Sequence, residues 1–282
     1  MNTGIIENRL KRYHTNSLET ELTGIREITQ ELILFALSTS DFFSHAAFQG
    51  GTCLRIVHGL NRFSEDMDFI LKTGDTAFSW QQYLTLIDTT LEQYGYSIEL
   101  QDKSNAEETV KKAFIKDDSI GKVLRLAYAN RQGTQRKIRI KLEIDTNPPG
   151  GGEFESAFIG FPAPSSITAE TLPTLFAGKS HALLCRKYEK GRDWYDLLWY
   201  LGNNTPVNYR RLSAALDQTG PWEGQGLSVD RTWYIDNMKR RIVEIDWKRA
   251  KDDVAPFISP QEQGLLSKWN AEFFLSALAR MA

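Results

Sequence analysis

The chain has 282 residues, of which 41% are hydrophobic, 25% are charged and 11% are aromatic, and its formal net charge is −2. This length allows one large domain or two modest ones, and the composition is typical of a folded protein, which excludes a disordered chain. The near-zero charge also excludes a protein that binds polyanions through its overall charge.

Positive charge is nevertheless concentrated in one stretch of the chain. Between Ser119 and Leu142 there are seven basic residues and no acidic residue, and they are Lys122, Arg125, Arg131, Arg136, Lys137, Arg139 and Lys141. From charge alone, a solvated hairpin with outward-pointing side chains is the preferred interpretation. The alternative is a local positive surface that meets a nucleic-acid backbone.

The sequence predicts a cytoplasmic protein with no membrane partner. No apolar run approaches the ~20 residues that span a bilayer, and residues 1–20 lack the apolar core of a signal peptide. Cys53 and Cys185 are far apart, without a CxxC pair or a histidine cluster. We therefore expect reduced thiols, and neither a disulfide framework nor a zinc site.

In chain order, the first half alternates between helical and strand patterns. Apolar residues recur at helical spacing over 22–43, with Ser17 as the expected N-cap, and further helices are predicted over 52–58 and 78–94. Strands are predicted over 66–71, 96–100, 122–129 and 137–145. The period of two is clearest in the last of these, where four isoleucine or leucine residues alternate with charged residues.

The second half is predicted to be helical. The segment Asn-Pro-Pro-Gly-Gly-Gly at 147–152 is the strongest break in the sequence. Helical patterns follow over 172–186, 193–201, 209–216, 232–245 and 261–279. The predicted fold class is α/β (α+β), with an α/β domain over residues 1–170 and an all-helical domain over 171–282.

Asp66 and Asp68 are the first candidate site residues. They lie two apart on a predicted strand, so both carboxylates leave the same face. Two carboxylates this close repel each other unless a proton or cation lies between them, and a hard divalent cation such as Mg²⁺ prefers oxygen ligands. An Asp-x-Asp pair alone is most often a solvated strand end.

Two neighbouring features favour a site here. Gly50 and Gly51 precede a predicted helix, where glycine lets backbone N–H groups approach a phosphate, although a tight turn is the usual role of such a pair. Glu143 and Asp145 share one face of a later strand, and either could complete a group of three carboxylates that binds two metal ions.

This combination resembles the nucleotidyltransferase superfamily, and in particular the AbiEii/AbiGii toxin family of type IV toxin–antitoxin and abortive-infection systems. The residues that carry the resemblance follow one another in order over 48–54, 59–69, 140–144, 175–186, 191–197 and 245–257. They extend over most of the chain, and several motifs in the right order are far more specific than one. The resemblance implies a nucleotidyltransferase-like mixed sheet, followed by a helical domain that closes a nucleotide cleft.

The resemblance also implies roles for individual residues. Asp66, Asp68 and Glu143 would bind Mg²⁺ or Mn²⁺, with Asp145 as a rival of Glu143 for the third carboxylate. Residues implied to hold the nucleotide are Gly50, Gly51, Thr52, Arg62, Ser64 and Lys179. Asp193 matches the last acidic position of the family and is equally suited to be a helix N-cap, while Asp196 is a weaker candidate. Gly178 stands where relatives carry glutamate, so Lys179 lacks that neighbouring acidic partner.

The implied activity is metal-dependent transfer of a nucleotide from an NTP to a hydroxyl acceptor. A tRNA 3′ end is the acceptor that the family suggests, and a cognate antitoxin encoded nearby is the implied partner, with no direct complex required. Two alternatives remain at this stage. One is nucleotidyl transfer to a protein or a small molecule, and the other is a nucleotide-binding regulatory module without catalysis.

Overall fold

The chain forms two compact units in a computed structural model that describes residues 3–13, 17–104, 108–117 and 138–281. The first unit comprises Met1–His58, Ser64–Pro148 and Glu155–Ala169, and the second comprises Gly59–Phe63, Pro149–Phe154 and Glu170–Ala282. A short excursion, Gly59–Phe63, thus belongs to the second unit although the chain before and after it belongs to the first. The predicted role of residues 171–282 in closing a nucleotide cleft stays a prediction.

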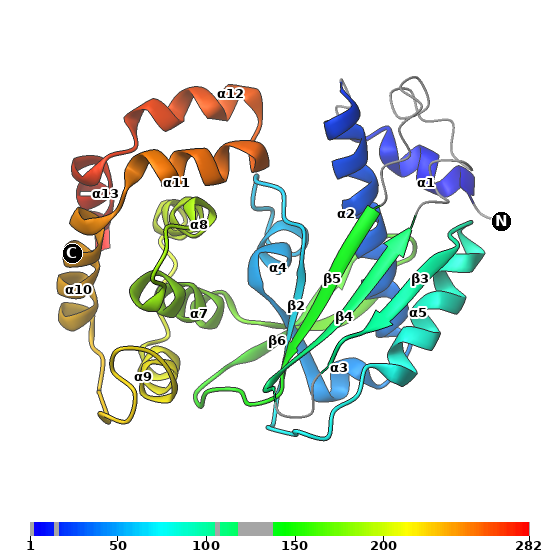
Figure 1. Cartoon of the computed structure of the whole chain (residues 1–282), viewed down its shortest axis with the longest axis horizontal. Coiled ribbons are helices and arrows are strands. Elements are labelled where there is room, and N and C mark those ends of the chain that lie inside the picture. The colour runs from blue at the N-terminus through cyan, green and yellow to red at the C-terminus, as the bar shows by residue number, and fades with distance from the viewer. Residues whose placement is uncertain (1–2, 14–16, 105–107, 118–137, 282) are drawn as a thin grey trace. The chain divides into compact units, whose positions relative to one another are not determined.

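The first unit is built on a mixed sheet whose seven described strands lie in the order β3-β4-β5-β2-β1-β7-β6 (Figure 1). β2 is parallel to β5 and antiparallel to β1, and β1 is parallel to β7. This arrangement confirms the predicted mixed-sheet fold class. The strands are β1 (Ala46–Gln49), β2 (Met67–Leu71), β3 (Ile98–Asp102), β4 (Val110–Asp117), β5 (Ile138–Asp145), β6 (Phe154–Ile159) and β7 (Ser165–Glu170).

Five described helices accompany the sheet in the first unit. They are α1 (Thr3–Leu10), α2 (Leu18–Ser38), α3 (Phe42–His45), α4 (Gly50–Ile56) and α5 (Gln81–Gln93). Ser17 caps α2 as predicted, because its hydroxyl accepts a hydrogen bond from the backbone N–H of Thr20. The helix predicted over 22–43 in fact ends at Ser38, and α3 follows as a separate turn. α2 packs against α5 and β5.

An aromatic cluster around Phe42 forms part of the core of the first unit. The Phe42 ring is fully buried and lies parallel to Trp80, at 5.8 Å between ring centroids. It also meets Phe69 of β2 edge to face at 5.0 Å, and Tyr83 of α5 at 5.0 Å. Edge-to-face aromatic pairs of this kind add to the stabilisation from buried area. The cluster therefore ties β2 to α3 and α5.

The second unit is helical after residue 171. Its described α-helices are α7 (Leu172–Cys185), α8 (Gly191–Gly202), α9 (Tyr209–Gln218), α10 (Arg231–Glu244), α11 (Trp247–Val254), α12 (Pro260–Gln263) and α13 (Ala271–Leu278). The helical second half was predicted, and the predicted helices correspond to α7 through α10 within a few residues. None of the described helices combines the length and the apolar character that a membrane crossing requires.

The single helix predicted over 261–279 is wrong. The chain forms α12, then a 3₁₀ helix over Gly264–Lys268, and then α13. Asn270 separates the last two, because its side chain accepts a hydrogen bond from the backbone N–H of Phe273 at 2.8 Å and so starts a new helix. Asparagine favours such capping positions over helix interiors.

Strands β1, β4, β6 and β7 were not predicted from the sequence. In β4 the buried face carries Lys111 and Asp117 beside Ala113 and Ile115, so burial alternates although hydrophobicity does not. In β6 the side chain of Phe158 is 78% exposed, which again breaks the expected pattern. The strand predicted over 122–129, and five of the seven basic residues of its neighbourhood, lie outside the described residues.

Replacing Phe42 by alanine is expected to destabilise the first unit by about 3–5 kcal/mol, because it removes a fully buried ring and leaves a cavity among its aromatic neighbours. Urea unfolding followed by far-ultraviolet circular dichroism measures the change. Phe158→Ala is the matched control, since the exposed ring should cost no more than about 0.5 kcal/mol. Equal unfolding midpoints for the two variants would contradict the assignment of this core.

Candidate active site

Asp68 and Glu143 lie opposite each other on neighbouring parallel strands. In the β2–β5 register, Asp68 is the partner of Glu143, and Met67 is the partner of Leu142. Residues that face each other across a ladder project from the same side of the sheet, so both carboxylates leave the side away from the buried Met67 and Leu142. Asp66 directly precedes β2, two residues before Asp68. The register therefore supplies the proximity that the predicted site requires.

Asp145 occupies a different position from Glu143. It pairs with Ile70 rather than with an acidic residue, and it ends β5. Its carboxylate accepts a hydrogen bond from the backbone N–H of Asn147 at 2.9 Å, which closes a turn of the Asx type. Asp145 thus has a local structural role, and Glu143 is the acidic residue of β5 that lies beside Asp68.

Gly50 brings backbone against the carboxylate of Asp68. Its φ is +77°, a conformation that L side chains rarely adopt. A Cβ atom at this position would lie 2.3 Å from Oδ2 of Asp68, far inside a contact distance. Both the conformation and the close approach require glycine here. Gly51 and Thr52 follow within α4, and Thr52 is fully buried.

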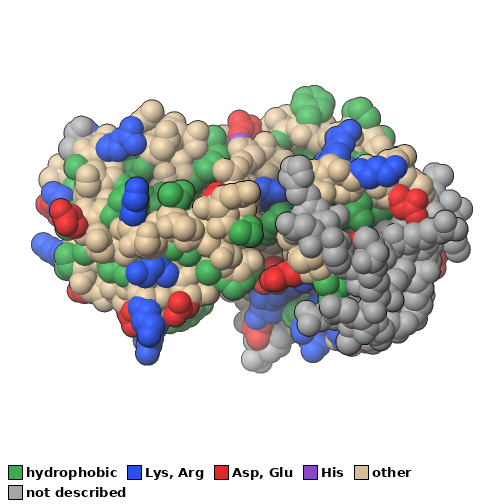
Figure 2. Space-filling model, turned by 90° about the horizontal axis from the view of Figure 1, so that it is seen from above, with side chains coloured by type: hydrophobic (Ala, Val, Ile, Leu, Met, Phe, Trp, Pro, Cys, Tyr) green, Lys and Arg blue, Asp and Glu red, His purple; other side chains and the backbone are tan. Residues whose placement is uncertain are grey.

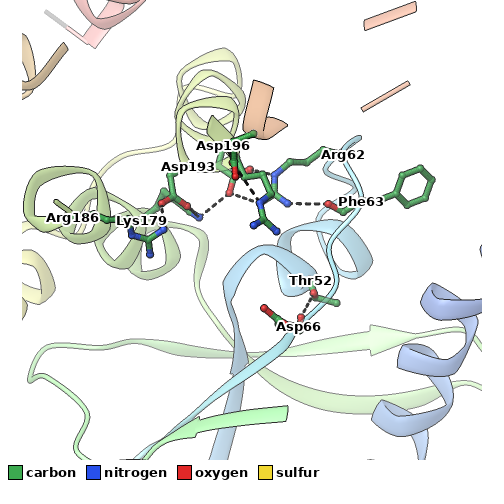
Figure 3. Close-up of polar contacts among 10 residues, drawn as sticks. Thr52, Arg62, Phe63, Asp66, Lys179, Arg186, Asp193 and Asp196 are labelled. Atoms are coloured by element: carbon green, nitrogen blue, oxygen red, sulfur yellow. Dashed lines mark hydrogen bonds and ion pairs between the residues drawn. The ribbon is translucent and has the colours of Figure 1, made fainter. Parts of the chain in front are cut away.

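Side chains hold the backbone that leads into β2. Nε2 of Gln30 donates to the carbonyl oxygens of Ser64 and Glu65, at 3.1 and 3.0 Å. The hydroxyl of Thr52 donates to the carbonyl oxygen of Asp66 (Figure 3). The carbonyl groups of 64, 65 and 66 are thereby bound by two side chains from α2 and α4. Gln30 belongs to no recognisable motif, and its amide reaches Ser64 only once the 33 residues between them have folded.

The fit to a divalent cation rests on the chemistry of these donors. Asp66, Asp68 and Glu143 offer carboxylate oxygens, which Mg²⁺ and Mn²⁺ prefer. Within the described ranges, no three acidic, histidine or cysteine side chains form a ready-made cation site. The carboxylate of Glu143 pairs with Nζ of Lys141 at 2.6 Å. The residues fit such a cation in type and register, and binding would require Glu143 to exchange Lys141 for the ion.

A second group of charged residues lies within the second unit. Nζ of Lys179 on α7 is 2.7 Å from Asp193 and 2.8 Å from Asp196, both on α8 (Figure 3). Arg186 also binds Asp193, at 2.8 Å. Gly178 leaves Lys179 without an acidic neighbour in the sequence, and its two carboxylate partners come instead from α8, where positions three residues apart lie on one face of the helix.

Arg62 completes this charge cluster, which comprises Arg62, Lys179, Arg186, Asp193 and Asp196. Its guanidinium donates two hydrogen bonds of 2.6 Å to Asp196 and one of 3.0 Å to the carbonyl of Phe63. Arg62 is 2% exposed and Asp196 is fully buried. The bidentate pair fixes the excursion Gly59–Phe63 to α8, both within the second unit. The predicted phosphate contact of Arg62 remains a prediction.

Asp193 is not a helix N-cap, contrary to one of its two predicted roles. α8 begins at Gly191 with Lys190 as the N-cap, so Asp193 lies inside the first turn. Burial alone would raise the pKa of Asp193, but the charges of Lys179, Arg186 and Lys190 hold it below its ordinary value. Burial alone would lower the pKa of Lys179, yet Asp193 and Asp196 raise it. Both groups are therefore held in their charged forms.

Acidic residues on adjacent strands beside a glycine turn, together with the mixed sheet, form the arrangement expected of a nucleotidyltransferase. The family model described as "Nucleotidyl transferase AbiEii toxin, Type IV TA system" matches residues 32–276, and the chain belongs to this family. Membership makes the protein a toxin-family nucleotidyltransferase and implies an antitoxin partner. A search of curated proteins finds no match.

One solved structure, MenT4, supports the fold, and a second is similar to this chain over most of its length. MenT4, a nucleotidyltransferase toxin from Mycobacterium tuberculosis H37Rv, is 14% identical, with a TM-score of 0.53 over 100% of this chain and 99% of that chain. JHP933 from Helicobacter pylori is 16% identical, with a TM-score of 0.49 over 90% of this chain and 92% of that chain.

Replacing Asp196 by alanine is expected to destabilise the second unit by about 3–5 kcal/mol, because it leaves the buried guanidinium of Arg62 without its partner. Six of the seven tryptophans belong to this unit, so tryptophan fluorescence during urea unfolding reports on it. Asp236→Ala removes an exposed partner of Lys239 and should change stability by no more than about 0.5 kcal/mol. A similar effect of both variants would argue against a structural role for the buried pair.

The destabilisation caused by Asp193→Asn should depend on pH. Because the folded protein holds the pKa of Asp193 below its unfolded value of about 3.9, the charged form contributes stability above that pH. This contribution is lost as the pH falls through the lower pKa of the folded state. Urea midpoints of the wild type and the variant should thus differ most above pH 5 and converge in acid. A difference that grows on acidification would contradict the assigned charge state.

Proposed function

We propose that the protein transfers a nucleoside monophosphate from an NTP to a hydroxyl acceptor in a reaction that depends on Mg²⁺ or Mn²⁺. The observation that carries this proposal is the parallel register in which Asp68 lies opposite Glu143. Membership of the AbiEii family supports the same reaction type.

The reaction forms one bond and breaks another at the α-phosphorus. The acceptor oxygen bonds to this phosphorus while the bond to the oxygen that bridges to the β-phosphate breaks, and pyrophosphate leaves. The acceptor proton passes to a carboxylate, for which Glu143 is favoured over Asp145 because Glu143 lies opposite Asp68, whereas Asp145 lies opposite Ile70 and closes a turn with Asn147. Phosphoryl-type transfer needs mainly positioning and charge stabilisation from the protein.

Asp66, Asp68 and Glu143 are the residues proposed to hold the cation. When bound, a divalent cation supplies positive charge to the phosphates and favours the deprotonated acceptor. The β2–β5 register orients the carboxylates of Asp68 and Glu143. Because residue 50 is glycine and has no side chain, Asp68 can lie against its backbone.

Each unit, taken by itself, has residues that are proposed to contact the nucleotide. In the first unit, the backbone of Gly50 and Gly51 and the hydroxyl of Ser64 are proposed to meet the triphosphate, and the Thr52 hydroxyl is already engaged by the carbonyl of Asp66. In the second unit, Lys179, Arg62 and Asp193 are proposed as nucleotide-site residues on the family resemblance. The ion pairs of Lys179 with Asp193 and Asp196 hold its side chain in a fixed direction.

The proposed acceptor is the 3′ end of a tRNA. Arg139 and Lys141 are the described members of the basic stretch, and Arg139 is exposed on β5, where its guanidinium lies 4.3 Å from the centre of the Phe114 ring. Basic and acidic side chains of the described residues are interspersed on the face in Figure 2, without one large area of a single sign. Arg139 and Lys141 are the described groups of this stretch that are proposed to meet an RNA backbone.

Incubation with each α-labelled NTP, Mg²⁺ and total tRNA tests the proposed reaction. The wild type should label tRNA, and Asp66→Ala and Glu143→Gln should each lower the rate by at least about 100-fold, since even outer-shell partners of metal ligands are worth 10–100-fold. Asp145→Asn should have the smaller effect. Glu92→Gln on the exposed end of α5 is the control for loss of a carboxylate.

The same incubation with a cell extract in place of total tRNA gives the outcomes that would replace the proposal. Label in protein or small molecules instead of tRNA would identify a different acceptor. NTP binding without transfer to any component of a cell extract would indicate a regulatory module. A larger loss with Asp145→Asn than with Glu143→Gln would reverse the assignment of the third carboxylate.

A further inference from the structure

Buried side chains bind three successive backbone carbonyl groups just before β2. The residues are Ser64, Glu65 and Asp66, and none of them belongs to a helix or strand. Gln30 binds the first two carbonyls and Thr52 binds the third. All of these residues belong to the first unit. We call this group the carbonyl clamp.

The donors of the clamp are buried. Gln30 is 1% exposed on α2, and Thr52 is fully buried on α4. A primary amide has two N–H donors, and Gln30 uses Nε2 for two consecutive carbonyl groups. Buried polar groups without a partner are costly, so this geometry is strongly favoured over alternatives in which the segment rotates. The clamp therefore fixes the path of the backbone on the N-terminal side of Asp66.

The path of this backbone sets the direction of the Asp66 side chain, because Asp66 precedes the residues of β2 that pair with neighbouring strands. Asp68 is held by its pairing with Gln49 and Glu143, whereas the pairing of β2 begins only at Met67. The direction of the Asp66 side chain depends on the peptide groups on either side of it, and the clamp binds the carbonyl groups of both Glu65 and Asp66. A half-exposed ion pair between Arg26 and Glu65 at 3.3 Å adds less to this than the buried hydrogen bonds do.

We propose that Gln30 and Thr52 are positioning residues that hold Asp66 in the orientation required for binding a divalent cation. This inference rests on the proposed function, in which Asp66 is a metal ligand. Neither side chain needs to contact the metal or the nucleotide. They act on the site through the backbone of 64–66, as outer-shell groups act on metal ligands in general.

The test is calorimetric titration of the full chain with Mn²⁺, which requires no turnover. Gln30→Met keeps the approximate size of the side chain and removes both donors, and we expect Mn²⁺ to bind at least about tenfold more weakly. Thr52→Val removes one hydroxyl at nearly constant shape and should weaken binding by a smaller factor. Gln93→Met, on the exposed end of α5, should bind Mn²⁺ like the wild type.

A readout of the transfer reaction separates positioning from folding. At a temperature well below unfolding, the Mg²⁺ concentration for half-maximal activity should rise for Gln30→Met, and added Mg²⁺ should restore much of kcat. A variant that is merely less well folded would lose activity in proportion to its folded fraction, as measured by circular dichroism, with an unchanged Mg²⁺ dependence. That result would overturn the clamp.

Asp66→Asn distinguishes failure of the clamp from failure of the proposed function. If Asp66→Asn weakens Mn²⁺ binding but Gln30→Met binds as tightly as the wild type, the metal site stands and the clamp is refuted. If Asp66→Asn leaves Mn²⁺ binding unchanged, Asp66 is not a ligand, and the proposed metal site and the clamp are both refuted.

Discussion

The register between β2 and β5 is the constraint on which the rest of the candidate site depends. Met67 and Phe69 of β2 and Leu142 and Ile144 of β5 are buried, so the strands can pair only with these residues on the core side. A slip by one residue would turn every side chain of a strand to the other face of the sheet. Because hydrophobic burial fixes the register, it also fixes Asp68 beside Glu143.

The two faces of β2 therefore differ, because one packs into the core and the other carries a carboxylate of the candidate site. Phe69 packs against Phe42 at 5.0 Å and against Phe48 of β1 at 5.3 Å, while its neighbour Asp68 lies against the backbone of Gly50. The carboxylates of Asp68 and Glu143 repel each other, so holding them side by side costs free energy. The packed core on the other face of the sheet holds the two strands in the register that keeps them together. In the part of the chain that ladder pairing does not reach, hydrogen bonds from Gln30 and Thr52 supply a comparable restraint.

How much was predictable from the sequence follows from how local each feature is. The alternation in β5, the helices after residue 171 and the turn at the glycine pair each depend on residues close together in the sequence. These predictions agree with the structure. β4 was missed because Lys111 and Asp117 occupy its buried face, which no hydrophobicity pattern reveals. The pairs Arg62–Asp196 and Gln30–Ser64 join residues 134 and 34 positions apart, so only the folded chain brings them together. Asp193 was wrongly given a capping role because its true partners, Lys179 and Arg186, lie on other elements or turns.

The charge cluster of the second unit carries a net positive charge and is therefore more than a set of neutral ion pairs that hold helices together. Three cations, Arg62, Lys179 and Arg186, share two carboxylates, so one positive charge remains (3 − 2 = 1). If the ion pairs served packing alone, apolar residues of similar volume would stabilise the buried positions at least as well. An excess cation held in one direction by two carboxylates is, however, suited to an anionic ligand, because little side-chain entropy remains to be lost on binding. The two carboxylates that orient Lys179 thus support its proposed role in contacting the phosphates.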